Sequence, residues 1–83
     1  MAQYTYYQRV ISKEHYYFAE EISDMLKLYG KHYSANQIHA LMREHEKSTA
    51  TQPLYYQTSR GLKKVYDFKC VFKLIEEQER VNE

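Results

Sequence analysis

The stretch HYSANQIHALMREHEK, residues 32–47, decides the fold that this sequence predicts. Ser34 and Gln37 have the S-x-x-Q spacing of a capping box, in which the serine hydroxyl accepts the backbone N–H of Gln37 and the glutamine side chain reaches back. Mostly apolar side chains then recur at helical spacing: Ile38, Leu41, Met42 and His45. The pattern predicts a helix over residues 35–46 that turns this stripe toward a core.

The opposite face of this predicted helix carries side chains of the kind that contact DNA. They are Asn36, Gln37, His39, Arg43 and Lys47. Asparagine and glutamine pair with adenine in the major groove, arginine pairs with guanine, and free N–H groups near Ser34 suit a phosphate oxygen. The small Ala40 leaves the centre of the face open. Each residue alone is equally typical of a solvated surface, so only their arrangement together indicates DNA.

A helix is also predicted upstream, over residues 18–29, from apolar positions at helical spacing. Its acidic residues cluster in the first turns, as the helix dipole favours, and Gly30 is expected to cap its C-terminus. Residues 30–33 then form a connection of about four residues to Ser34. Two helices joined in this way have the form of a helix-turn-helix.

Downstream, the composition is that of a loop, a hairpin and a last helix. Residues 48–53, STATQP, predict the loop. Two β-prone runs around Gly61 predict a hairpin over residues 54–68, with Arg60, Lys63 and Lys64 at or near its tip. The last helix is expected over residues 69–80, with Asp67 as N-cap.

At the start of the chain, tyrosine-rich residues 3–11 predict a strand that adds to the hairpin.

The bulk composition bounds the function. Residues 1–83 are expected to form one α+β domain, which buries only roughly 60–65% of its unfolded surface and leaves little room for a deep active site. No run approaches the roughly 20 apolar residues that span a bilayer. The single Cys70 cannot form an internal disulfide, which favours a reducing cytoplasm. We expect no contact with membranes.

Neither catalysis nor metal binding is expected. The histidines at positions 15, 32, 39 and 45 never occur at the i, i+4 spacing that clamps a metal on one helix. Gly30 and Gly61 are the only glycines, so no glycine-rich phosphate loop exists. The sequence therefore predicts a protein that is not an enzyme and has no cofactor.

The net charge of +1 hides an uneven distribution. Residues 27–73 hold nine basic and three acidic side chains, whereas the two flanks together hold three basic and eight acidic ones. A basic middle between acidic ends is typical of a protein with a polyanionic partner.

Tyrosine is unusually frequent, at ten of 83 residues. A core this small cannot bury all of Tyr4, Tyr6, Tyr7, Tyr16, Tyr17, Tyr55 and Tyr56. Tyrosine is enriched where proteins meet, so the alternative function is a protein-binding inhibitor or adaptor, with self-association through the N-terminal strand. Cross-strand stacking on the sheet also accounts for the tyrosines.

A family resemblance supports the DNA-binding interpretation. The run from HYYFAEEISDML, through the capped helix, to RGLKKVYDFKCVFKLIEE resembles the winged helix-turn-helix domains of phage and transposon excisionases and MerR-type regulators. The resemblance covers roughly residues 16–79. It implies base or phosphate contacts from Ser34, Asn36, Gln37, His39 and Arg43, and wing contacts from Arg60, Lys63 and Lys64. The expected function is sequence-specific binding of double-stranded DNA by an accessory protein of a phage, plasmid or transposon, acting in recombination, transfer or transcription.

Overall fold

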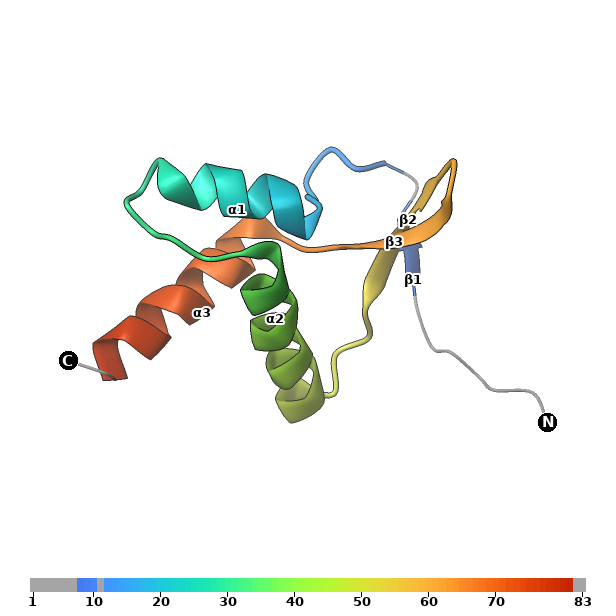
Figure 1. Cartoon of the computed structure of the whole chain (residues 1–83). Coiled ribbons are helices and arrows are strands. Elements are labelled where there is room, and N and C mark those ends of the chain that lie inside the picture. The colour runs from blue at the N-terminus through green and yellow to red at the C-terminus, as the bar shows by residue number, and fades with distance from the viewer. Residues whose placement is uncertain (1–7, 11, 82–83) are drawn as a thin grey trace.

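Three helices and a three-stranded sheet make up the part of the chain that the computed structural model describes, residues 8–10 and 12–81 (Figure 1). The elements follow the predicted order of strand, helix, helix, hairpin and helix, which confirms the α+β class. Their bounds are β1 Gln8–Val10, α1 Ala19–Lys27, α2 Ala35–Thr49, β2 Leu54–Thr58, β3 Gly61–Val65 and α3 Phe68–Val81. None of these helices is both long and apolar enough to cross a membrane.

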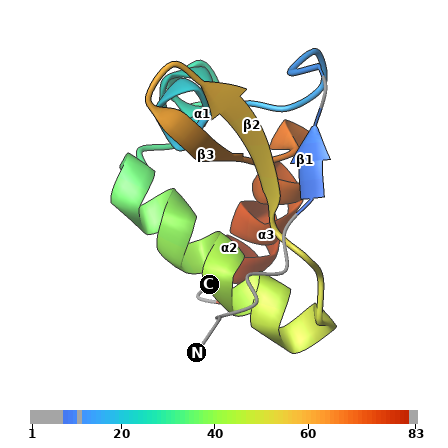
Figure 2. The ribbon, with the colours of Figure 1, turned by 90° about the vertical axis from the view of Figure 1, so that its right-hand side faces the viewer.

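The central strand of the sheet is β2, with β1 on one edge and β3 on the other (Figure 2). Strands β2 and β3 form an antiparallel hairpin, whereas β1 runs parallel to β2 and places Val10 opposite Tyr56. Parallel neighbours need a crossover connection, which the segment containing α1 and α2 supplies. The predicted addition of the N-terminal strand to the hairpin is confirmed for residues 8–10. The other predicted strand residues, 3–7 and 11, lie outside the described residues.

The hairpin turns through only two residues, of which Arg60 is the second. The Thr58 hydroxyl donates to the Gly61 carbonyl (2.7 Å) and accepts the Arg60 N–H (3.2 Å). Gly61 has a φ of 112°, a conformation that favours glycine. This tight turn places Lys63 and Lys64 in β3, so Arg60 alone of the three predicted cations lies at the tip.

Two predicted helix caps are confirmed. At the end of α1, the Lys31 N–H donates to the Leu26 carbonyl (3.0 Å) and the Gly30 N–H donates to the Lys27 carbonyl (3.1 Å). These are the two bonds of a Schellman motif, and Gly30 has the positive φ, 73°, that the motif requires. At the start of α3, an Asp67 carboxylate oxygen accepts the backbone N–H two residues on (3.0 Å).

The second helix begins at the predicted residue and ends three residues later than predicted. The Ser34 hydroxyl accepts the Gln37 N–H (3.2 Å), and Gln37 Oε1 accepts the Ser34 N–H (2.8 Å), so the capping box is formed. At the other end, the hydroxyls of Ser48 and Thr49 both donate to the His45 carbonyl (3.0 and 2.8 Å). These two bonds lie in the last turn of α2, in residues that were predicted as loop.

The core lies where the three helices meet the end of β3. Its most deeply buried side chains are Ala19, Ile22 and Leu26 of α1, Ile38 of α2, and Val71 and Ile75 of α3. Tyr66 joins this cluster and pairs with Tyr17 through two backbone bonds of 2.9 Å. The predicted hairpin therefore stops at Val65, and the chain then packs on the helices. Tyr29, the last residue of the predicted first helix, lies beyond the last turn of α1 and is 59% exposed.

Replacing Gly30 by alanine is expected to lower the free energy of unfolding by about 1 kcal/mol, since an L side chain is strained at this φ. A Cβ at this position meets nothing within 4 Å, so the loss comes from the backbone alone. Urea unfolding measures it. Gly30→Asn is the matched control and should lose less, because asparagine tolerates the left-handed region. Equal stability of the alanine variant and the natural protein would contradict the Schellman end.

Candidate nucleic-acid interface

One side of α2 presents a row of exposed residues. Asn36, Ala40, Arg43 and Lys47 follow at intervals of four, three and four residues and are all exposed, so they line one face of the helix. Neither cation of this row has an ion-pair partner within residues 8–10 and 12–81. We call these four residues the α2 row.

Two of the predicted contact residues, Ser34 and Gln37, are partly occupied by the capping box. Because Gln37 Oε1 accepts the Ser34 N–H, the capping box fixes the direction of this oxygen and leaves it one lone pair, whereas both amide N–H groups are free to donate. Bidentate pairing with adenine needs both the oxygen and the nitrogen of one amide, so Asn36 is the amide suited to it. The Ser34 hydroxyl accepts one bond from Gln37 and keeps its own proton to donate.

His39 was predicted on the outer face of α2 and instead turns toward the core. Its side chain is half-buried, and Nδ1 lies 2.6 Å from the Tyr66 hydroxyl. The two rings also meet edge to face at 5.5 Å between centroids. Burial lowers the pKa of His39; the Glu20 carboxylate opposes this change and the Lys64 charge reinforces it. His39 therefore positions Tyr66 and does not extend the α2 row.

Lys64, predicted to contact DNA, is held by α2. Its ammonium lies 2.6 Å from Glu46 Oε1, and the two side chains are only 20% and 14% exposed. The same ammonium lies 5.5 Å from the centre of the Tyr66 ring. A pair this well covered is screened little by solvent, so Lys64 is a structural residue that fastens β3 to α2.

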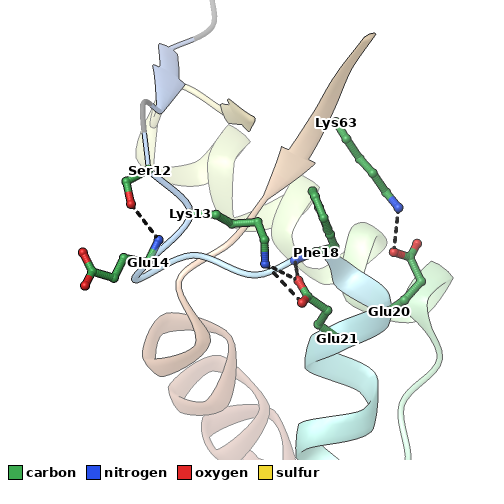
Figure 3. Close-up of polar contacts among 7 residues, drawn as sticks. All are labelled: Ser12, Lys13, Glu14, Phe18, Glu20, Glu21 and Lys63. Atoms are coloured by element: carbon green, nitrogen blue, oxygen red, sulfur yellow. Dashed lines mark hydrogen bonds and ion pairs between the residues drawn. The ribbon is translucent and has the colours of Figure 1, made fainter. Parts of the chain in front are cut away.

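Lys63 makes a looser contact with the start of α1 (Figure 3). Its ammonium lies 3.0 Å from Glu20 Oε2, with the two side chains 48% and 56% exposed, and 4.6 Å from the centre of the Phe18 ring. The bond from Lys63 lowers the pKa of Glu20. On the other side of Phe18, Lys13 binds Glu21 at 2.9 Å. Exposed pairs contribute little to stability, so Lys63 can leave Glu20 for another anion.

These contacts bring the hairpin beside the α2 row. The bonds His39–Tyr66 and Glu46–Lys64 both join α2 to the chain of β3 and its continuation, and Arg43 lies between them along the helix. Burial raises the pKa of the Tyr66 hydroxyl, and the Arg43 charge opposes that rise. Figure 2 shows α2 and the hairpin on the side turned toward the viewer. The hairpin and α2 are therefore neighbours on this side of the molecule.

Sequence reasoning missed the residues that fix this arrangement, namely Tyr66, Glu46 and Glu20. The sequence does indicate that Glu46 and His39 share one side of the helix, because they are seven residues, or two turns, apart. Nothing local indicated Tyr66, whose partners lie 27 and 49 positions away along the chain.

The structure gives Cys70 a packing role. It is half-buried against the core, its sulfur lies 3.8 Å from His45 Nε2, and burial raises the pKa of the thiol. A protonated thiol is a poor nucleophile. Within the described residues, no three His, Cys, Asp or Glu side chains gather in a way that could hold a metal ion.

Lys64→Ala is expected to lower the free energy of unfolding by about 1.5–3 kcal/mol, because it leaves the covered Glu46 carboxylate without its charged partner. Lys63→Ala is the matched control and should change stability by less than about 1 kcal/mol. Chemical denaturation of both variants tests the contrast. Equal losses would show that the two lysines do not differ in role.

His39 should make stability fall as the pH drops below neutral. Its folded pKa lies below the ordinary value of 6.5, so the unfolded chain takes up the proton first. Stability contributed by neutral His39 is complete above 6.5 and is lost as the pH falls from there toward the folded pKa. Thermal unfolding at about pH 7.5 and about pH 5.5 measures this. His39→Gln keeps a carbonyl acceptor for Tyr66 and should show a smaller drop; an unchanged drop would assign the effect to other groups.

Comparisons with known proteins add no further constraint on the function. Models of known protein families, curated proteins and solved structures yield no significant match to this chain. The α2 row, the hairpin and their contacts are therefore the basis for a functional proposal.

Proposed function

We propose that this domain is a winged helix-turn-helix that binds double-stranded DNA. The observation that carries the proposal is the α2 row, an exposed line of amide, small and cationic side chains on a capped helix beside a hairpin with an arginine tip. Such a helix fits the major groove, and residues in its N-terminal half reach bases. Here α2 is the recognition helix and the β2–β3 hairpin is the wing.

The proposed DNA contacts come from side chains whose polar groups are not engaged within the protein. Asn36 has both amide atoms available for adenine, and Arg43 has its guanidinium available for guanine or a phosphate. Ala40 between them permits close approach to the groove. The Ser34 hydroxyl and the first N–H groups of α2 suit a phosphate oxygen, and Lys47 adds a charge near the other end of the helix.

Of the three cations in the wing, fewer are available to DNA than the sequence alone predicts. Arg60 at the tip is exposed and has no ion-pair partner within the described residues, so it can reach the backbone or minor groove. Lys63 can exchange the Glu20 carboxylate for a phosphate, because both partners are exposed. Lys64 keeps its bond to Glu46. The proposed biological role is that of an accessory DNA-binding protein of a mobile element, acting in recombination, transfer or transcription.

Arg43→Ala is expected to weaken binding to a selected duplex by about 1–3 kcal/mol, roughly tenfold to a hundredfold. A random duplex library enriched at physiological salt supplies the target, and fluorescence anisotropy measures the affinity. Arg60→Ala should weaken binding with little dependence on sequence and should reduce the slope of log K against log salt by about 1.

The matched control is Lys73→Ala, which removes one exposed, unpaired cation from α3. Its affinity should stay close to that of the unmodified protein. Failure of the library to enrich any motif would rule out sequence-specific binding. If Lys73→Ala and Arg43→Ala weaken duplex binding equally, the affinity depends on net charge alone, and α2 has no special role in it.

A further inference from the structure

Three aromatic rings form a groove between the end of α1 and the first turns of α3, on the side of the molecule away from the hairpin (Figure 1). The Tyr29 ring centre lies 5.1 Å from that of Phe72 and 6.0 Å from that of Phe68, and the two phenylalanines are 5.7 Å apart. The hollow measures about 280 Å³. Leu28, the residue before Tyr29 in the chain, is 85% exposed. Apolar surface is thus left in water here, which marks interaction sites on small proteins.

Two unpaired lysines border the same groove. Lys69 and Lys73 lie one turn apart on α3, line the hollow and are exposed. No carboxylate of the described chain lies within 4.0 Å of either ammonium. By contrast, five other lysines each have a carboxylate partner: Lys13, Lys27, Lys31, Lys63 and Lys64. The groove therefore offers a ready site for negative charge next to an apolar hollow.

We propose that this groove binds an acidic peptide segment of a partner protein, with an apolar side chain among the three rings and carboxylates on Lys69 and Lys73. Hydrophobic anchors in aromatic grooves supply most of the affinity in such complexes, and flanking charges supply selectivity. Glu76 also lines the groove, and Glu79 of the Lys31–Glu79 pair adds a second carboxylate on α3. These carboxylates repel acidic residues, so the glutamates of the peptide are favoured only beside Lys69 and Lys73. This surface is separate from the α2 row and goes beyond the proposed DNA binding.

Two other occupants fit less well. A second copy docked about a two-fold axis would set Lys69 and Lys73 near the same lysines of its partner, and like charges there are unfavourable. Single-stranded nucleic acid needs an open ring face on which a base can stack. Here Phe68 and Phe72 are half-buried, the rings tilt against one another, and the Lys31 ammonium lies over Phe72 at 5.4 Å. An inserted side chain suits this geometry better than a stacked base.

A direct test uses a fluorescein-labelled peptide with a central Leu-Phe pair flanked by glutamates, with anisotropy as the readout. Matched peptides replace the Leu-Phe pair by serines or the glutamates by lysines, and both should bind much more weakly. Tyr29→Ala should weaken binding of the acidic peptide about tenfold or more. The double variant Lys69→Glu/Lys73→Glu should do the same. Amide shift changes on binding should centre on Tyr29, Phe68 and Phe72.

The matched control is Arg43→Glu/Lys47→Glu, which makes the same change in net charge on α2 and should leave peptide affinity unchanged. The peptide titrations contain no duplex, so a failure of duplex binding would not affect their result. The proposal is overturned if the acidic peptide does not bind, if both double variants weaken it equally, or if a labelled oligothymidine binds the groove more tightly. Tyr29-dependent dimerisation in sedimentation velocity without peptide binding would overturn it in favour of a second copy.

Discussion

The attachment of Tyr66 sets the position of the hairpin, and the proposed interface depends on it. Its backbone pairs with Tyr17 ahead of α1, its ring lies in the core, and its hydroxyl bonds to His39 on α2. A side chain that is only 3% exposed and held from three directions has little freedom to move. The direction of the strand that leads into Tyr66 is therefore fixed, and the covered Lys64–Glu46 bond fastens this strand to α2.

Ion pairs within the chain occupy several of the cations that the sequence analysis assigned to a polyanionic partner. The basic middle of the chain holds nine cations, but Lys27, Lys31, Lys63 and Lys64 are bound to carboxylates of the same chain. The cations that remain fall into two groups. Arg43, Lys47 and Arg60 lie with the α2 row and the hairpin tip, and Lys69 and Lys73 lie on α3. A single basic region of the sequence thus becomes two separate surfaces in the fold.

Prediction from sequence succeeded where the deciding interactions are local and failed where they are not. The capping box of α2, the Gly30 end of α1 and the Asp67 cap of α3 each involve bonds between residues within a few positions of one another. The position of His39 was wrong because helical spacing alone cannot tell whether a side chain at the edge of the apolar stripe has a polar partner. The partner, Tyr66, is 27 residues away and belongs to a different element. The ion pairs of Lys63 and Lys64 could not be predicted for the same reason, since their carboxylates come from α1 and α2.

The separation of the two cationic groups gives a physical reason to treat duplex and peptide binding as compatible. A single patch cannot hold a duplex and an acidic segment at once, because both ligands would compete for the same charges. Here the hairpin lies toward one side of the molecule and the end of α1 toward the other (Figure 1), and the groove shares no residue with the α2 row. At physiological salt, charges further apart than about 8 Å are largely screened from one another. The proposed duplex site and the proposed peptide site therefore do not compete for the same cations, and binding at one does not exclude binding at the other.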